Sequence, residues 1–119
     1  MSHSPQDVHK KVLGKKSEKL VAEYLKKQRI EILKTNYRTP FGEADLIARE
    51  GEEILFVEVK ARTSDAYGTP REAVDRAKQK RYYKIAEYYA MQTGEEPNAR
   101  FDVAEVFSDG EITYYKNAF

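Results

Sequence analysis

The sequence predicts an α/β domain in which one helix is followed by three strands, a second helix and two further strands. Apolar residues recur at helical spacing near the amino terminus and again in the second half of the chain. Between and after these stretches lie short runs of β-branched and aromatic residues, separated by turn signals that contain glycine. These patterns together give the predicted order of elements.

Length and composition are those of one globular domain. The chain has 119 residues, 34% charged and 40% hydrophobic, and we expect residues 1–119 to form a single domain with a frayed tail at residues 1–7. The longest apolar run is too short to span a bilayer, and Met1 to Gln6 lacks the apolar region of a secretory signal. We therefore expect a cytoplasmic protein without membrane contact.

The ionisable residues limit the kinds of metal site. The chain has no cysteine, and its two histidines, His3 and His9, lie near the amino terminus. Any metal would therefore need oxygen ligands, which favours magnesium, manganese or calcium over zinc. Because the net charge is only +1, a surface that binds anions would have to come from local basic clusters.

The first helix is predicted over residues 8–28 because an apolar stripe with helical spacing runs through it. The stripe consists of Leu13, Leu20, Val21, Tyr24 and Leu25. Residues 29–37 give a modest strand signal, and the Thr39-Pro40-Phe41-Gly42 stretch indicates a turn.

The next two strands, residues 43–49 and 54–62, form a predicted hairpin whose register can be derived. The turn is predicted at Gly51 and Glu52, where glycine supplies the positive φ that a primed turn requires. With these two residues at its centre, Asp45 lies opposite Glu58, and opposed residues have Cβ atoms ~5 Å apart. A three-residue loop would shift this register by one and separate the two carboxylates.

The hairpin also brings Lys60 to the same face as Glu58, because residues two apart in a strand point the same way. Two adjacent carboxylates repel each other, and a divalent cation relieves this repulsion. Asp45 and Glu58 are therefore candidate metal ligands, and Lys60 is a candidate for orienting water and stabilising phosphate charge. Glu43 is expected to face away. The structural alternative is a solvated strand end where Lys60 pairs with a carboxylate.

The rest of the chain predicts a second helix and a second hairpin. The helix is expected from Pro70 or Arg71 to Thr93, before Gly94. The hairpin joins strands 100–107 and 111–116 and is expected to complete the sheet. Basic residues near tyrosines on the helix suit phosphate contact and base stacking, although solvated lysines are the alternative reading. These residues are Arg76, Lys78, Lys80, Arg81 and Lys84, with Tyr82 and Tyr83.

Several of these motifs resemble a known family. Asp45 followed by Glu58-Val59-Lys60 after an apolar strand resembles the D…ExK pattern of the restriction-endonuclease-like nuclease superfamily. Along almost the whole chain, the motifs also resemble the YraN-type bacterial family within that superfamily. The matching segments are Asn36-Tyr37-Arg38, residues 42–47, residues 56–62, Arg100-Phe101-Asp102-Val103 and Asn117-Ala118-Phe119. Ser17 and Arg29 differ from the family pattern, which commonly has glycine there, and this concerns backbone and packing more than chemistry.

The resemblance implies a restriction-endonuclease-like fold with a central mixed sheet of about five strands flanked by helices, as in archaeal Holliday-junction resolvases. It implies metal-dependent cleavage of DNA with Mg²⁺ or Mn²⁺, with branched or repair structures among the candidate substrates. By analogy with the resolvases, it also implies a homodimer. Glu18 fits the helix glutamate that joins the metal site in those resolvases. Contacts to nucleic acid are expected from Asn36, Arg38, Arg62, Lys78, Gln79 and Arg81. RNA offers the same phosphates.

Two other function classes fit the same residues. A non-catalytic nucleic-acid-binding module would use the basic helix, with the acidic cluster as an ancestral feature. Its binding would weaken steeply as salt rises, with or without magnesium. A protein-interaction domain would use the tyrosines as anchors and would show no DNA affinity at low salt.

Overall fold

The computed structural model describes residues 5–62, 74–96 and 98–119, with side chains from Lys15 onward. The described elements follow the predicted order of helix, three strands, helix and two strands. They are α1 (Pro5–Lys27), β1 (Glu31–Thr39), β2 (Gly42–Glu50), β3 (Glu53–Arg62), α3 (Arg76–Thr93), β4 (Asn98–Phe107) and β5 (Ile112–Tyr115).

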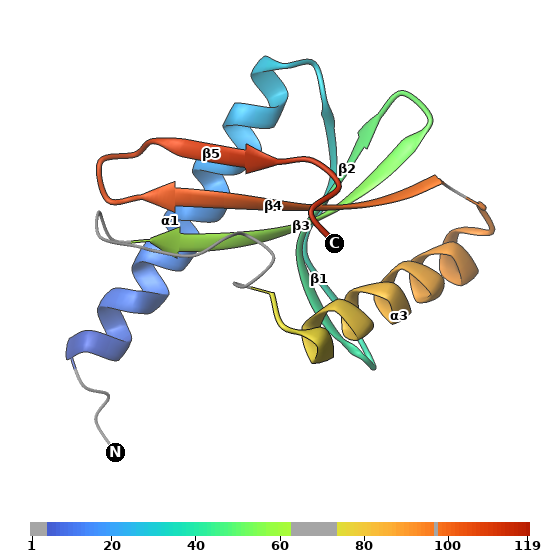
Figure 1. The fold of residues 1–119 in the computed structure, drawn as a ribbon, viewed down its shortest axis with the longest axis horizontal. Helices are drawn as coiled ribbons and strands as arrows, with labels where there is room; N and C mark the ends of the chain where they lie inside the picture. Colours follow the sequence, from blue (N-terminus) through green and yellow to red (C-terminus); the bar gives the residue numbers. More distant parts are fainter. Residues whose placement is uncertain (1–4, 63–73, 97) are drawn as a thin grey trace.

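The strands form a five-stranded mixed sheet in the order β1-β2-β3-β4-β5. β3 and β4 are parallel, and the other neighbouring pairs are antiparallel. In Figure 1, α3 lies in the crossover between the two parallel strands, beside the β1–β2 hairpin. The predicted α/β class and mixed sheet are thus confirmed.

The two helices cover opposite faces of the sheet. Val21 and Leu25 of α1 pack on Leu55 and Val57 of β3, whose alternate residues point to that face. On the other face, the α3 residues Tyr82, Ile85 and Tyr89 pack on Ile54 and Phe56. β3 is therefore buried on both sides, which explains its continuous apolar run.

The helix starts differ from those predicted. α1 begins at Pro5 rather than Val8, so residues 5–7, which were expected in a frayed tail, are helical. Proline is tolerated in a first turn because the N–H that it lacks would have no partner there. α3 begins at Arg76 rather than near Pro70, because Asp75 caps it by accepting from the Lys78 N–H at 2.8 Å. Residues 70–73 lie outside the described residues.

The end of α1 explains one departure from the family pattern. Arg29 has φ 64°, a left-handed conformation that favours glycine, and the Ile30 N–H donates to the Leu25 carbonyl at 3.1 Å. This closing turn also delays β1, which begins at Glu31 rather than at Arg29. Ser17, the other departure, is buried in α1 and only 4% exposed.

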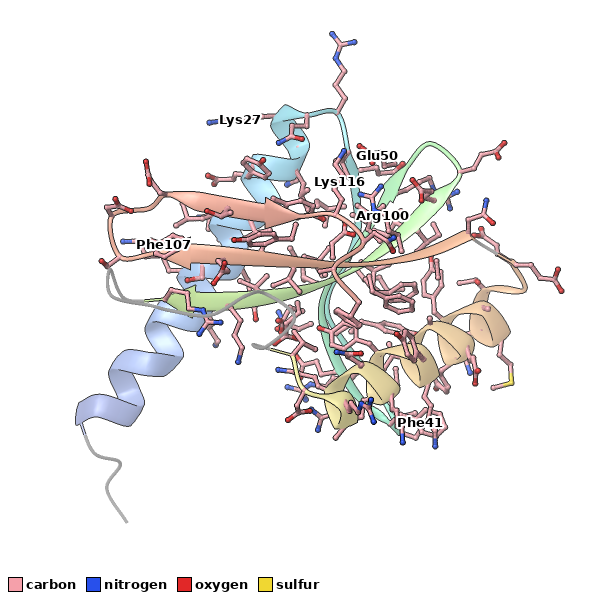
Figure 2. All side chains as sticks on the ribbon, in the orientation of Figure 1. Lys27, Phe41, Glu50, Arg100, Phe107 and Lys116 are labelled. Carbon is pink, nitrogen blue, oxygen red and sulfur yellow. The ribbon has the colours of Figure 1, made fainter. Side chains whose placement is uncertain are left out.

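A buried polar network joins the turn end of the β2–β3 hairpin to β4 and β5. Asp102 is fully buried and accepts from Arg100 and from the Tyr114 hydroxyl at 2.6 Å. Arg100 also donates to Glu50 at 2.8 Å and to Glu53 at 3.0 Å. Figure 2 shows Arg100 and Glu50 side by side at this end of the sheet. Burial alone would lower the pKa of Arg100, but the hydrogen bonds and charges of Asp102 and Glu50 outweigh it and raise that pKa. The hydrogen bond from Arg100 lowers the pKa of Glu50.

Candidate active site at the fork between two strands

Strands β2 and β3 part at the positions of the two candidate carboxylates. Their ladder runs from Glu50↔Glu53 to Leu46↔Val57, which is the predicted register, and ends there. Asp45 and Glu58 are the next residues on each strand. The Asp45 carboxylate accepts a hydrogen bond from the Val59 N–H at 2.8 Å, so it replaces the backbone partner that β2 no longer offers.

The β1–β2 ladder is interrupted at the same level. Its partners Thr35↔Leu46 and Tyr37↔Ala44 flank Asn36 and Asp45, which are absent from the paired positions, and Asn36 has φ 50°. The alternation of β2 also changes here, since Ala44 packs on the α3 face and Leu46 on the α1 face. The fork is therefore a local irregularity of the sheet, where one β1–β2 pair is missing while the register on either side of it is unchanged.

Asn36, at this irregularity, brings Glu43 toward the site. With its amide nitrogen turned toward the carboxylates, Asn36 donates to Glu43 Oε1 at 2.9 Å and to Glu18 Oε2 at 3.1 Å. The prediction that Glu43 faces away was therefore wrong, because Asn36 holds Glu43 together with Glu18. Arg38 lies 3.7 Å from Glu43 on the solvent side.

The clustered carboxylates perturb one another. Burial, followed by the charge of Glu58, raises the pKa of Asp45 to about 7, although the Val59 N–H opposes the shift. Burial also raises the pKa of Glu18, with a further contribution from the charge of Glu43, while hydrogen bonds from Asn36 and with Asp45 oppose it. Groups from α1, β2 and β3 thus form one electrostatic unit with an excess of negative charge.

Glu58 is stabilised from α3. Its side chain is 6% exposed, and Lys78 Nζ lies 2.5 Å from Oε1 while the Tyr82 hydroxyl donates to Oε2 at 2.7 Å. Burial and the nearby carboxylates raise the pKa of Tyr82 well above its usual value, so its hydroxyl stays protonated and keeps donating to Glu58. Lys78 and Tyr82 reach Glu58 together because residues four apart share one helix face.

Lys60 lies two residues beyond Glu58 and is half-buried. Strand alternation places both on the α3 face of the sheet, and the partner of Lys60 on β4 is Glu105. Glu105 is 5% exposed and accepts from Arg62 Nε at 2.9 Å. The cation that the structure pairs with Glu58 is therefore Lys78 and not Lys60.

The carboxylates have the chemistry of a hard-metal site without forming a closed cage. Within the part of the chain that the structure describes, no three carboxylate or imidazole side chains are arranged as metal ligands. Magnesium needs only one or two carboxylates when water and substrate phosphate complete its shell. Burial and the charge of Glu58 raise the pKa of Asp45, and a divalent cation beside the two would offset both effects, so Asp45 and Glu58 could supply the one or two carboxylates that such an ion needs.

The predicted nucleic-acid contacts fall into two groups. Lys78 and Arg62 are paired with Glu58 and Glu105, and Gln79 Nε2 donates to the Val74 carbonyl at 3.0 Å. Asn36, Arg38 and Arg81 are exposed, with Asn36 also holding the carboxylates. Their contacts to nucleic acid stay predictions.

The basic face of α3 is only partly aromatic. Arg76, Lys80 and Lys84 are exposed, and Lys84 lies over Phe41, 5.5 Å from the ring centre. Figure 2 shows Phe41 at the tip of the β1–β2 hairpin, next to α3. Tyr82 is 1% exposed and cannot stack on a base, so only Tyr83, at 42%, keeps that predicted role.

The role of Lys78 and Tyr82 at Glu58 was missed by sequence reasoning. Their spacing of four residues was visible, but which strand their helix face would meet depends on the β3–α3 crossover.

Among the described residues, neither helix is long and apolar enough to cross a membrane.

Comparison with known proteins identifies the family. The model of the uncharacterised protein family UPF0102 matches residues 17–106. A UPF0102 protein of Alkaliphilus metalliredigens is 45% identical over 112 residues, covering 92% of this chain and 98% of the relative. One of Thermodesulfovibrio yellowstonii is 44% identical over 107 residues, covering 90% and 95%, and one of Syntrophus aciditrophicus is 48% identical over 111 residues, covering 89% and 87%. The predicted YraN-type family is thus confirmed, and the chain belongs to the uncharacterised protein family UPF0102.

Proposed function

We propose that this protein has a restriction-endonuclease-like fold and is a divalent-metal-dependent endonuclease that hydrolyses DNA phosphodiester bonds at the β2–β3 fork. The observation that carries the proposal is the meeting of Asp45, Glu58 and Glu18 from three elements where the ladder ends. Carboxylates concentrated at an irregularity of a sheet cost stability, and such features cluster at functional sites.

Asp45 and Glu58 would hold Mg²⁺ or Mn²⁺, with Glu18 as a further ligand after a side-chain rearrangement, since no three carboxylates are arranged as ligands among the described residues. When bound, the ion would polarise the phosphate and lower the pKa of a bound water. Val59 fixes the orientation of Asp45 through its N–H, and Asn36 fixes that of Glu18. Lys60, on the same face as Glu58, would orient water and stabilise charge that develops on the phosphate.

A cleavage assay tests this function. Labelled branched, duplex and single-stranded DNAs are incubated with manganese, magnesium or chelator and the natural protein, Asp45→Asn or Lys60→Ala. Lys34→Ala, an exposed lysine of β1, is the matched control. We expect metal-dependent products with the natural protein and the control, reduced at least a hundredfold in the two site variants. Equal products from all four proteins, or no product under any condition, would overturn the proposal.

A second candidate is a nucleic-acid-binding module without catalysis. The observation in its favour is the Lys78–Glu58 pair, because an ammonium already compensates the carboxylate that a metal would need. This candidate predicts DNA binding without cleavage, and binding whose salt dependence is the same in magnesium and in chelator. A nuclease requires the metal for product formation, so the two candidates differ in the same assay.

A further inference from the structure

An open groove adjoins the carboxylate cluster on the α1 side of the sheet. Its volume is about 430 Å³, within the range of small-ligand sites, about 300–1,000 Å³. It is lined by Lys15, Glu18, Lys19, Ala22, Thr35, Asn36 and Leu46. Glu18 and Asn36 belong to both the groove and the cluster, so the two are continuous.

The groove combines a cationic rim with an apolar floor. Lys15 and Lys19 are exposed and lie one helical turn apart on α1, on either side of Glu18 in sequence. The floor includes Leu46, which is fully buried, and the half-buried Ala22. Thr35 and Asn36 of β1 add polar groups on the opposite wall.

The two lysines are not used to neutralise the cluster. Among the described residues, neither forms an ion pair, although both are near Glu18 in sequence. Glu18 is instead held by Asn36. The lysine charges are thus directed to the groove, next to carboxylates that would repel a phosphate and so require nearby cations to hold one.

We propose that this groove is a subsite for the sugar–phosphate backbone of a nucleic acid, adjacent to the cleavage position. Lys15 and Lys19 bind a phosphate, the Thr35 hydroxyl offers it a hydrogen bond, and the Ala22–Leu46 floor receives the sugar, while both amide N–H groups of Asn36 stay on the carboxylates. Lysine and threonine are common phosphate-contacting residues. The inference rests on the proposed function, since it adds a substrate surface to that site, but it is tested by binding alone.

The test compares two doubly substituted proteins of equal charge. Lys15→Ala/Lys19→Ala removes the groove cations, and Lys26→Ala/Lys27→Ala removes two exposed lysines from the last turn of the same helix. Binding of fluorescent single-stranded DNA, single-stranded RNA and duplex DNA is measured in chelator over a salt series. Circular dichroism establishes that both proteins are folded.

We expect the groove variant to lose about tenfold in affinity at low salt, with the slope of log K against log salt reduced by about 0.7 for single strands, because one phosphate contact is lost. The control should keep the affinity of the natural protein within about twofold. A similar loss in both variants, an unchanged slope in the groove variant, or no binding by the natural protein would overturn the inference. The DNA and RNA arms identify which backbone the groove takes. Because no metal is present, failed cleavage would not be mistaken for failed binding.

Discussion

The ammonium of Lys78 in α3 lies 2.5 Å from Oε1 of Glu58 in β3. Glu58 is 6% exposed and Lys78 is 26% exposed at the side chain, so the pair is largely withdrawn from water. A buried carboxylate is strongly destabilising once its counter-ion is removed. The ion pair between Lys78 and Glu58 therefore links α3 to the fork. A metal ion bound to Glu58 would compete with the Lys78 ammonium for this carboxylate.

Replacing Lys78 with methionine should lower stability and strengthen the response to metal. We expect a loss of about 2 kcal/mol in chelator, below the 3–5 kcal/mol of fully buried pairs because Lys78 is partly exposed. Magnesium should raise the melting temperature of this variant more than that of the natural protein. Lys80→Met, at an exposed position of the same helix, is the control. Identical melting of the two variants in chelator would contradict the role of Lys78.

Asp45→Asn should stabilise the protein at alkaline pH. The folded pKa of Asp45, about 7, is above its ordinary value of 3.8, so the folded state binds the extra proton between these values. Asp45 therefore carries no penalty below pH 3.8, and stability falls as pH rises through 7. At pH 8, asparagine should relieve on the order of 2–4 kcal/mol, at 1.36 kcal/mol per pKa unit.

The measurement is urea unfolding of both proteins from pH 4 to pH 8. The gain from Asp45→Asn should be large at pH 8 and close to zero at pH 4. Asp109→Asn, in the exposed β4–β5 turn, controls for the loss of one charge. A variant less stable than the natural protein at pH 8 would refute the raised pKa.

The hairpin register was predictable because two local features determine it. Gly51, with φ 61°, occupies the turn, and the apolar run of β3 specifies which residues face the core. From these, the proximity of Asp45 and Glu58 follows without knowledge of the rest of the fold. The order of elements was predictable for the same reason, since helix and strand periodicities are local.

The partners of these carboxylates depend on contacts distant in sequence. Asn36 contacts Glu18 from the position where one β1–β2 pair is missing, and the loss of a single pair leaves no periodic signal. Lys78 reaches Glu58 because α3 crosses the sheet at one place among many that its apolar stripe allows. Such placement is set by packing of the whole domain, so sequence patterns assigned Lys78 to the solvent side.

Arg29→Gly should stabilise the fold. A left-handed conformation costs an L-residue about 1–2 kcal/mol, and Arg29 holds φ 64° in the turn that ends α1. Glycine removes this cost but adds freedom to the unfolded chain, so we expect a net gain of about 0.5–1 kcal/mol. Thermal unfolding measures it. The control is Gln28→Gly, one residue earlier, which adds the same freedom to the unfolded chain but removes no left-handed strain, so it should destabilise the fold. Equal effects of the two changes would argue against strain at Arg29.

Tyr114→Phe should weaken the buried network around Asp102. The Tyr114 hydroxyl donates to Asp102 Oδ2 at 2.6 Å, and the loss of a hydrogen bond to a buried charged group costs about 1.5–3 kcal/mol. Arg100 and the Asn117 N–H still hold the carboxylate, so the variant should remain folded. The control is Tyr24→Phe, because Tyr24 packs on Tyr114 with ring centres 5.8 Å apart.

Unfolding in urea should separate the two tyrosine variants by at least 1 kcal/mol. A cycle with Asp102→Asn isolates the pair, because the cost of Tyr114→Phe should fall once the acceptor has lost its charge. An equal cost in both backgrounds would mean that the hydroxyl acts through packing alone. Since Asp102 is fully buried and Arg100 is 8% exposed, the coupling should also persist at high salt, unlike that of the exposed Arg38–Glu43 pair.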